Sequence, residues 1–393
     1  MDRSAGMVAA PASLRARALS AADELFARVG QRLLAAADVR FGGDRPWDIQ
    51  VHDPRLYRSS ILGGSIAFGE AYVRGWWSCS DIEELAFRFA RSRLEEVAAL
   101  LPGGLLHRLR SLVSNQQTRA RSLRVARRHY NFGNHLFLAF LGAHPSYSCG
   151  YFRDTDELDA AQRNKLELIC GKLDLRPGEH LLDVGGGWGE LARHAARYYG
   201  VRVTSINISE EQMHVARERC RGLPIEIVRC DYRDVRGSFD KVAAIAMLTH
   251  VGYRNYRTFM ETMRRALRPD GILLIEGIWS NVSSRNLDSW LDKYIFPGAM
   301  LPSGKQTFAA CERLFVVEDL HNFGPDYVKT LRAWRANFRA AWPQLAADYS
   351  EDVRRIFDYY FAICAGYFRA RSIQNWQLVL TLPGRAQPRA RLS

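Results

Sequence analysis

Apolar strands and amphipathic helices alternate through the middle of the chain. The first strand begins at His180 and closes on Asp183, and a glycine-rich turn and a helical pattern then lead to Gly200. Further strands and helices are predicted at residues 201–206, 225–229, 239–246 and 271–276 (strands) and at 157–173, 209–221 and 253–268 (helices). This β-α-β succession predicts an α/β fold with a parallel sheet, in which a ligand lies across the carboxyl ends of the strands.

The first part of the chain has a different pattern. Residues 8–37 repeat apolar positions at helical spacing and predict a helix, whereas residues 46–75 predict short strands separated by Asp-Pro and Gly-Gly pairs. A helix rich in Leu and Phe follows a predicted N-cap at Ser80.

After residue 276 the chain leaves the alternating pattern. An insertion at residues 278–306 is rich in aromatic and turn residues and suits a cover over an apolar channel. A returning strand, two helices and a last strand are predicted after it, at 314–323, 325–345, 350–371 and 373–382. The basic, proline-containing tail at 384–393 is expected to be disordered.

The turn after Asp183 allows a ligand to lie directly against the backbone. It carries glycines at 185, 186, 187 and 189, and a side chain at these positions would hold a ligand away. Such turns also bind dinucleotides or serve structure alone, so the glycines do not identify the ligand.

The ends of the next strands separate the ligand classes. Asn207 stands where a dinucleotide fold normally has Asp or Glu to hold a ribose, and Gln212 follows one helical turn later. At the end of the third strand, Asp231 and Tyr232 could hold and stack on an adenine. With Trp188 among the glycines, this set favours S-adenosylmethionine over NAD.

Composition and charge restrict the class of protein. The 393 residues, 47% apolar and 25% charged, suffice for a sizeable core and suggest two domains. No apolar run reaches the length of a membrane span, and no compact signal-peptide core is present, so we expect a cytosolic protein. The seven cysteines form no CxxC pair, and neither a disulfide framework nor a metal site is expected.

The net charge of +13 favours a polyanionic partner, either nucleic acid or the anionic face of a membrane. Residues 104–128 contain seven arginines and no acidic residue, with leucines grouped at the start. This stretch suits the surface of an anionic bilayer or a solvated linker. Nucleic acid is not expected, because no stacking aromatics alternate with the arginines.

Residues 126–152 combine aromatic side chains with a Gly-Asn turn and the polar set Tyr147, Ser148 and Cys149. The pattern suits a loop that wraps a ligand, and a buried hairpin is the alternative.

Taken together, several motifs resemble the bacterial cyclopropane-fatty-acyl-phospholipid synthases. The matching stretches lie between residues 48 and 383 and are GEAYVRGWW, HYNFGNHLF, YSCGYF, LLDVGGGWGELA, NISEEQ, HVGYRNY, DKYIFPGAMLP, EDLHNFGPDYVKTLRAW and SIQNWQ. The combination is specific, because several of these stretches are long.

The resemblance implies a small, mostly helical N-terminal domain at 1–118 and a Rossmann-like class I methyltransferase domain at 119–383, with helices on both faces of its sheet. The insertion at 278–306 becomes a lid over an acyl channel. The implied reaction transfers a methylene group from S-adenosylmethionine to the double bond of an acyl chain in a phospholipid. The implied partner is a phospholipid bilayer, at the inner face of the membrane, and a homodimer stays open.

Position by position, the resemblance places the cofactor at nine residues: Tyr147, Ser148, Gly185, Gly187, Gly189, Asn207, Gln212, Asp231 and Tyr232. Asn207 departs from the family pattern, which usually has Thr there.

The chemistry requires more than a cofactor site. An alkene is a poor nucleophile, so the sulfonium methyl must be held in line with it in a dry site. Attack leaves a carbocation on the lipid, which the faces of Tyr294, Phe296 and Tyr327 could stabilise. A base must then remove a proton from the new methyl group to close the ring.

In the family that base is a bound bicarbonate, held by a Cys-containing loop, a Glu-His pair, a His at a strand end and a Tyr. This chain keeps Cys149, His250 and Tyr327, but Thr249 replaces the family's Glu and Glu276 replaces the strand-end His. Bicarbonate as a cofactor is therefore in doubt. Cys149 is expected to shape the ligand loop rather than to act as a nucleophile, because the transfer needs no covalent intermediate.

Three hypotheses follow from these two departures. In the preferred one, Glu276 replaces the bicarbonate, either as the base or as a carboxylate that stabilises the cation. In the second, altered proton removal gives a methyl-branched or methylated unsaturated chain. In the third, the chain is an inactive paralogue that binds a membrane surface.

Overall fold

The computed structural model describes residues 21–94, 117 and 132–391. The first part of the helix predicted at 8–37 and the basic stretch at 104–128, apart from Gln117, lie outside the described residues. So does the domain boundary predicted at residue 118, which stays a prediction.

A seven-stranded sheet forms the centre of the fold, with strand order β5-β4-β3-β6-β7-β9-β8. Its strands are β3 His180–Val184, β4 Arg202–Asn207, β5 Ile225–Arg229, β6 Phe239–Ile245, β7 Leu267–Ser280, β8 Val316–Asn322 and β9 Ile373–Thr381. The first five strands in this order are parallel, as predicted, and β9 is antiparallel to both of its neighbours. The strand predicted at 271–276 is longer, because its far end pairs with β9 up to Ser280.

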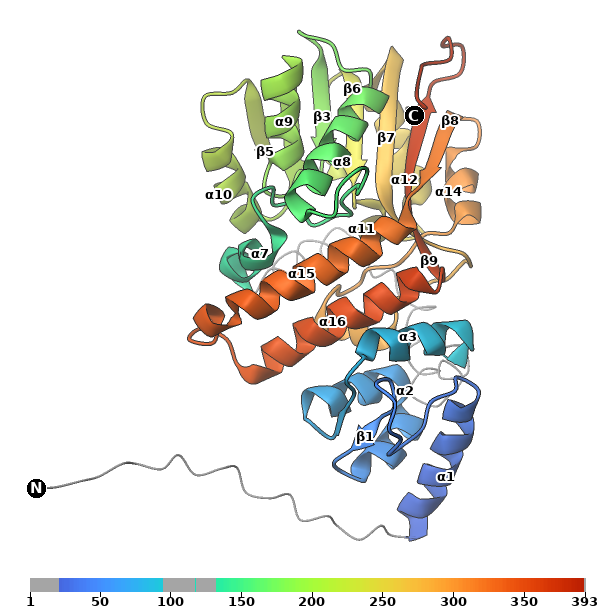
Figure 1. Cartoon of the computed structure of the whole chain (residues 1–393). Helices are drawn as coiled ribbons and strands as arrows, with labels where there is room; N and C mark the ends of the chain where they lie inside the picture. Colours follow the sequence, from blue (N-terminus) through green and yellow to red (C-terminus); the bar gives the residue numbers. More distant parts are fainter. Residues whose placement is uncertain (1–20, 95–116, 118–131, 392–393) are drawn as a thin grey trace, which may run out of the picture.

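Helices cover both faces of the sheet and confirm the predicted fold class (Figure 1). On one face, α8 (Leu158–Lys172) and α9 (Glu190–Tyr199) bury apolar side chains against β3, β4, β7 and β9. On the other, α12 (Tyr256–Ala266) and α14 (Gly304–Cys311) pack against β6 and β7. The short elements at the strand ends are α10 (Glu210–Arg219), η1 (Tyr232–Asp234), α11 (Leu248–Val251) and α13 (Ser289–Tyr294).

The N-terminal region differs from its prediction. It contains α1 (Ala21–Ala35), a pair of two-residue strands (β1 Gln50–Val51, β2 Trp77–Ser78), α2 (Arg55–Val73) and α3 (Ile82–Arg91). The strands predicted over 46–75 are mostly wrong, because the Gly63-Gly64 pair only kinks α2, with φ +64° at Gly64, and does not end it. The N-cap of α3 is Asp81 rather than Ser80, since the Asp81 carboxylate accepts the Glu84 N–H at 2.9 Å.

The segment predicted as a ligand loop or hairpin contains a helix, α7 (Gly133–Leu141), before the loop that carries Tyr147. Leu136, Phe137 and Phe140 of α7 are buried, and this apolar face explains the helix. Ser148 and Cys149 are buried as well, with exposed fractions of 5% and 0%.

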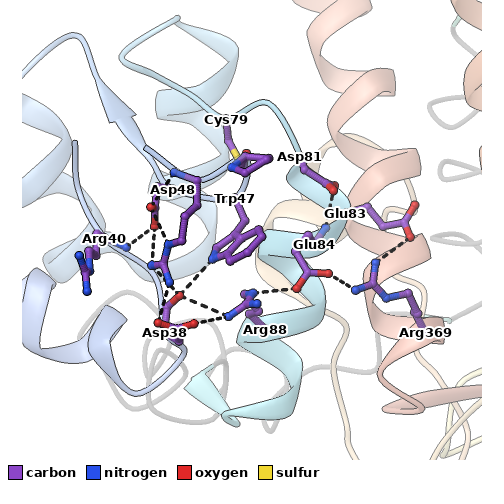
Figure 2. Close-up of polar contacts among 12 residues, drawn as sticks. Asp38, Arg40, Trp47, Asp48, Cys79, Asp81, Glu83, Glu84, Arg88 and Arg369 are labelled. Carbon is purple, nitrogen blue, oxygen red and sulfur yellow. Dashed lines mark hydrogen bonds and ion pairs between the residues drawn. The ribbon is translucent and has the colours of Figure 1, made fainter. Parts of the chain in front are cut away.

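Two long helices, α15 (Gly324–Leu345) and α16 (Glu351–Arg369), run side by side between the sheet and the N-terminal helices (Figure 1). Figure 2 shows how the N-terminal region attaches to α16: Arg369 reaches Glu83 and Glu84 of α3, and Arg88 joins Glu84 to Asp38. The N-terminal helices therefore brace the helices that carry Tyr327 and Tyr360.

Among the described residues, no helix is both long enough and apolar enough to cross a bilayer. Residues 384–391 form neither helix nor strand, but Ala390 is buried and the Arg391 guanidinium lies 3.3 Å from the Asp319 carboxylate.

Asp358 is the carboxylate that ties α16 to α15. It accepts hydrogen bonds from Arg335 at 2.8 and 2.9 Å and from Arg339 at 2.6 Å. Burial opposes its ionisation, but these two arginines lower the pKa of Asp358 to about 2. We expect Asp358→Asn to lower the free energy of unfolding by about 3 kcal/mol at neutral pH, because the partly buried guanidinium of Arg335 and the more exposed one of Arg339 lose their counterion. Urea denaturation measures this loss.

The lowered pKa of Asp358 also determines how its contribution to stability depends on pH. Stability from Asp358 is present above the carboxyl pKa of the unfolded chain and is lost as the pH falls toward about 2, so the variant and the wild type should converge in acid. Asp154→Asn, which removes an exposed ion pair with Arg153, is the matched control and should change little. An Asp358→Asn midpoint equal to that of the wild type would contradict the assignment.

Candidate active site

A cavity of about 200 Å³ lies at the carboxyl ends of β3, β4 and β6. A water molecule needs roughly 10–15 Å³ by such a measure, so the space suits a ligand many times larger. Its lining includes all the cofactor residues implied by the sequence except Gly189: Tyr147, Ser148, Gly185, Gly187, Asn207, Gln212, Asp231 and Tyr232. Gly189 instead begins α9 with φ +81° and packs against Ala216 and Cys220 of α10 and its end.

The glycine turn owes its shape to three positive φ angles, at Gly185 (+82°), Gly187 (+55°) and Gly189 (+81°). The space around Gly187 is open, so the backbone there is accessible to a ligand. Gly186 has a different role, which the sequence analysis missed. A Cβ at Gly186 would lie 1.8 Å from Ser205 Oγ and 2.5 Å from Asp183 Oδ2.

Asp183 and Ser205 form a buried pair beneath this turn, with Ser205 Oγ donating to Asp183 at 3.0 Å. Burial raises the pKa of Asp183 to about 6. The hydrogen-bonded pair therefore packs directly against the glycine turn at Gly186.

Asn207 organises the end of β4. Its Nδ2 donates to Gln212 Oε1 at 3.0 Å, and its Oδ1 accepts the N–H groups of Ile208 and Ser209 at 2.7 and 3.1 Å. Ser209 in turn caps α10. Asn207 and Gln212 are thus held together at one edge of the cavity before any ligand enters.

Asp231 and Tyr232 form the next edge. Arg233 donates to both Asp231 oxygens, at 3.1 and 2.8 Å, and also donates to the backbone oxygen of Gln117 at 2.8 Å. Gln117 lines the cavity and reaches Gly298 O with its amide. No local pattern singles out Gln117, because its partners lie more than a hundred residues away.

The aromatic residues expected around the carbocation do not all contact one another in the structure. Tyr147 lies 5.2 Å from Trp334 and 6.1 Å from Phe296, and Tyr327 lies 6.1 Å from Trp334, as measured between ring centroids. Tyr294 is placed differently, because its hydroxyl donates to Glu70 at 3.1 Å and its ring packs on Trp290. The ring contacts of the described residues do not join Tyr294 to the other two, and its expected role stays a prediction.

Trp334 and Tyr360 complete the aromatic group and were not predicted. The Tyr147 hydroxyl donates to the Tyr360 hydroxyl at 2.9 Å. Tyr147 thus belongs both to the cavity lining and to the aromatic group, and connects the two.

Glu276 is completely buried on the sheet face that α8 covers. Its Oε2 accepts the amide of Gln377, its partner on β9, at 2.7 Å, and Oε1 has no hydrogen-bond partner among the described residues. Burial raises the pKa of Glu276, and Lys165 and the Gln377 amide oppose this shift.

Cys149 and Tyr327 lie near this carboxylate. Burial raises the pKa of each well above its usual range, and the negative charge of Glu276 adds to both shifts. The structure therefore brings Glu276, Cys149 and Tyr327 into one electrostatic environment. Glu276 does not itself line the cavity.

Thr249 and His250 lie on α11. The Thr249 hydroxyl donates to Ala246 O at 3.2 Å, so the side chain supplies no carboxylate. His250 lines the cavity, and burial lowers its pKa to about 4, which keeps the imidazole neutral near pH 7.

Cys149 is a poor nucleophile. Its thiol donates to Gly150 O at 3.2 Å, and its raised pKa leaves little thiolate. We expect Cys149→Ser to retain at least about a tenth of the wild-type kcat/KM, a cost below ~1.4 kcal/mol. Cys170→Ser, another buried thiol on α8, measures the general cost of a hydroxyl in the core. Complete loss of turnover in folded Cys149→Ser alone would mean that the thiol takes part in the chemistry.

Comparisons with known proteins agree with this geometry. The family model described as mycolic acid cyclopropane synthetase matches residues 116–378. The cyclopropane-fatty-acyl-phospholipid synthase of Escherichia coli (strain K12) is 42% identical over 366 residues, which cover 92% of this chain and 95% of that protein. The tuberculostearic acid methyltransferase UfaA1 of Mycobacterium tuberculosis is 33% identical, with 85% and 83% covered.

Among solved structures, the mycolic acid cyclopropane synthase CmaA1 complexed with SAH and CTAB superposes with a TM-score of 0.62 at 29% identity. The alignment covers 66% of this chain and 97% of that structure. Fold, motifs and sequence identity agree, and the chain belongs to the mycolic acid cyclopropane synthetase family.

Proposed function

We propose that the chain transfers a methylene group from S-adenosylmethionine to the double bond of an unsaturated acyl chain in a phospholipid, and so forms a cyclopropane ring. The observation that carries the proposal is the position of Tyr147, which joins the glycine-turn cavity to a buried group of aromatic rings. The open backbone at Gly187 and the edge at Asp231 and Tyr232 fit the cofactor.

When bound, the cofactor supplies an electrophilic methyl group. The residues around Tyr147 exclude water and hold the alkene, whose electron pair forms the new carbon–carbon bond while the sulfur leaves with its own pair as a neutral sulfide. The faces of Tyr147, Tyr327 and Trp334 stabilise the resulting cation on the lipid.

Glu276 supplies the negative charge that this step needs. Its carboxylate lies outside the cavity lining and acts on the cation across a buried medium, and as the base it would accept the proton of the new methyl group once the acyl chain reaches it. The electrons of that C–H bond then close the ring. The Thr249 hydroxyl already donates to a backbone carbonyl, so we propose that catalysis does not require bicarbonate.

The two departures at Thr249 and Glu276 also favour a second candidate, a methyl-branched or methylated unsaturated product. The unsaturated chain arises if the proton leaves from another carbon, and a saturated methyl-branched chain would need a hydride donor in addition. The tuberculostearic acid methyltransferase UfaA1 is among the relatives. An inactive paralogue is less well supported, because the cavity keeps its glycine turn and its strand-end residues.

The site of action that we propose is the inner face of the membrane, where the chain binds the bilayer peripherally and not nucleic acid. Bilayer binding follows from the substrate and from the net charge of +13.

The test uses purified protein, methyl-labelled S-adenosylmethionine and vesicles of either unsaturated or fully saturated phospholipid. We expect label in the acyl chains of the unsaturated vesicles alone, and protein that sediments with anionic vesicles. Absence of label from both lipids would overturn the proposal.

A further inference from the structure

Lys165 of α8 is a buried ammonium group that lines the cofactor cavity, with an exposed fraction of 1%. Its Nζ donates to Ser146 Oγ at 2.5 Å and to Ser148 Oγ at 3.1 Å. In the part of the chain that the structure describes, no carboxylate forms an ion pair with it. Glu276, Glu190 and Asp183 act on the charge only from farther away.

Lys172, the other buried lysine on α8, differs from Lys165 in having a direct carboxylate partner. Lys172, also 1% exposed, donates to Asp319 Oδ2 at 3.0 Å and so has a direct counterion. A buried charge held by neutral hydroxyls alone is costly, and such groups normally pair with an opposite charge. Lys165 and both serines line the cavity, so a counterion bound there would lie beside the ammonium group.

We propose that Lys165, with Ser146 and Ser148, binds the carboxylate of the amino-acid part of S-adenosylmethionine. The assignment rests on the proposed function. That carboxylate is the only anionic group of the ligand, and a charge-assisted hydrogen bond to a buried ammonium is strong. With the adenine at Asp231 and Tyr232, on another edge of the same cavity, the ligand spans the glycine turn.

The competing role for Lys165 is that of a distant counterion to Glu276 and Asp183, with no contact to the ligand. The two roles differ in what they predict for two ligands. S-adenosylhomocysteine carries the amino-acid part, whereas methylthioadenosine has the same nucleoside and sulfur without it. Only a direct contact makes the affinity ratio of the two ligands depend on Lys165.

Calorimetry on the purified full chain measures both affinities. We expect Lys165→Met to weaken S-adenosylhomocysteine roughly 10- to 100-fold, the size of a hydrogen bond to a charged group, and to change methylthioadenosine by less than about 3-fold. Lys165→Gln keeps hydrogen-bonding capacity without the charge and gives the same readout if Lys165→Met does not fold. Lys172→Met is the matched control, which should lower stability and leave the ratio of affinities unchanged.

Equal weakening of both ligands, or of neither, would overturn the assignment and leave the proposed function intact. Failure of the wild type to bind either ligand would instead overturn the proposed function, so the two failures are distinguishable.

Discussion

Replacing Glu276 by Gln should lower kcat by about 10²- to 10⁴-fold while the affinity for S-adenosylmethionine stays close to that of the wild type. The amide has nearly the same shape and can keep a hydrogen bond with Gln377, but it carries no charge and accepts no proton. Initial rates on unsaturated vesicles and calorimetry of the folded variant measure the two effects separately.

The pH profile adds a second readout for Glu276. Burial raises the pKa of this carboxyl group, and only the ionised form can act. Wild-type kcat/KM should therefore be highest above that raised pKa and fall as the pH drops through it. The variant should lack this limb.

Two further variants test whether the loss of rate is specific to the carboxylate of Glu276. Glu226→Gln removes an exposed carboxylate on β5 and should leave the rate unchanged. The double variant Thr249→Glu, Glu276→His reproduces the pattern of the family and should make activity depend on added bicarbonate. A cyclopropane product formed by Glu276→Gln at an undiminished rate would contradict the role of Glu276.

Gly186→Ala should weaken both the fold and the binding of the cofactor. The added methyl group would lie 1.8 Å from Ser205 Oγ and 2.5 Å from Asp183 Oδ2, far inside van der Waals contact, so the hydrogen-bonded pair or the turn must shift. We expect a loss of about 1–3 kcal/mol in the free energy of unfolding and at least a tenfold, roughly 1.4 kcal/mol, loss of affinity, because the turn must shift toward the ligand. Thermal melting and calorimetry measure these changes.

Gly304→Ala is the matched control for this substitution. A Cβ at Gly304 meets its nearest neighbours at 3.4 to 3.5 Å, which is ordinary contact, at the start of α14. It should change neither stability nor cofactor affinity. Unchanged affinity and melting temperature in Gly186→Ala would show that the turn is not packed as described.

The sequence predicted the parallel part of the sheet and most of the cavity lining, because both follow from local patterns. Strand alternation, glycines with positive φ and polar residues at strand ends are all short-range signals. The helix α2 was missed for the opposite reason. Gly63-Gly64 has the composition of a turn, but the backbone leaves helical geometry only at Gly64, and the chain is helical on both sides of this kink.

Residues whose roles depend on distant partners could not be predicted. In the sequence Lys165 is simply a residue on the buried face of a predicted helix. Its role becomes visible only when Ser146 and Ser148 fold against it. Trp334 and Tyr360 enter the aromatic group only through the packing of α15 and α16, and the hydroxyl of Tyr294 is held by Glu70 of α2.

The most direct test of the central claim follows the hydrogens of the transferred methyl group. With S-adenosylmethionine carrying a fully deuterated methyl, a cyclopropane product retains two of the three deuterium atoms, because the third leaves as the abstracted proton. Mass spectrometry of the fatty acids released from unsaturated phospholipid should show this two-deuterium product. Products that retain all three deuterium atoms would contradict cyclopropane formation and establish the methyl-branched or methylated unsaturated chain.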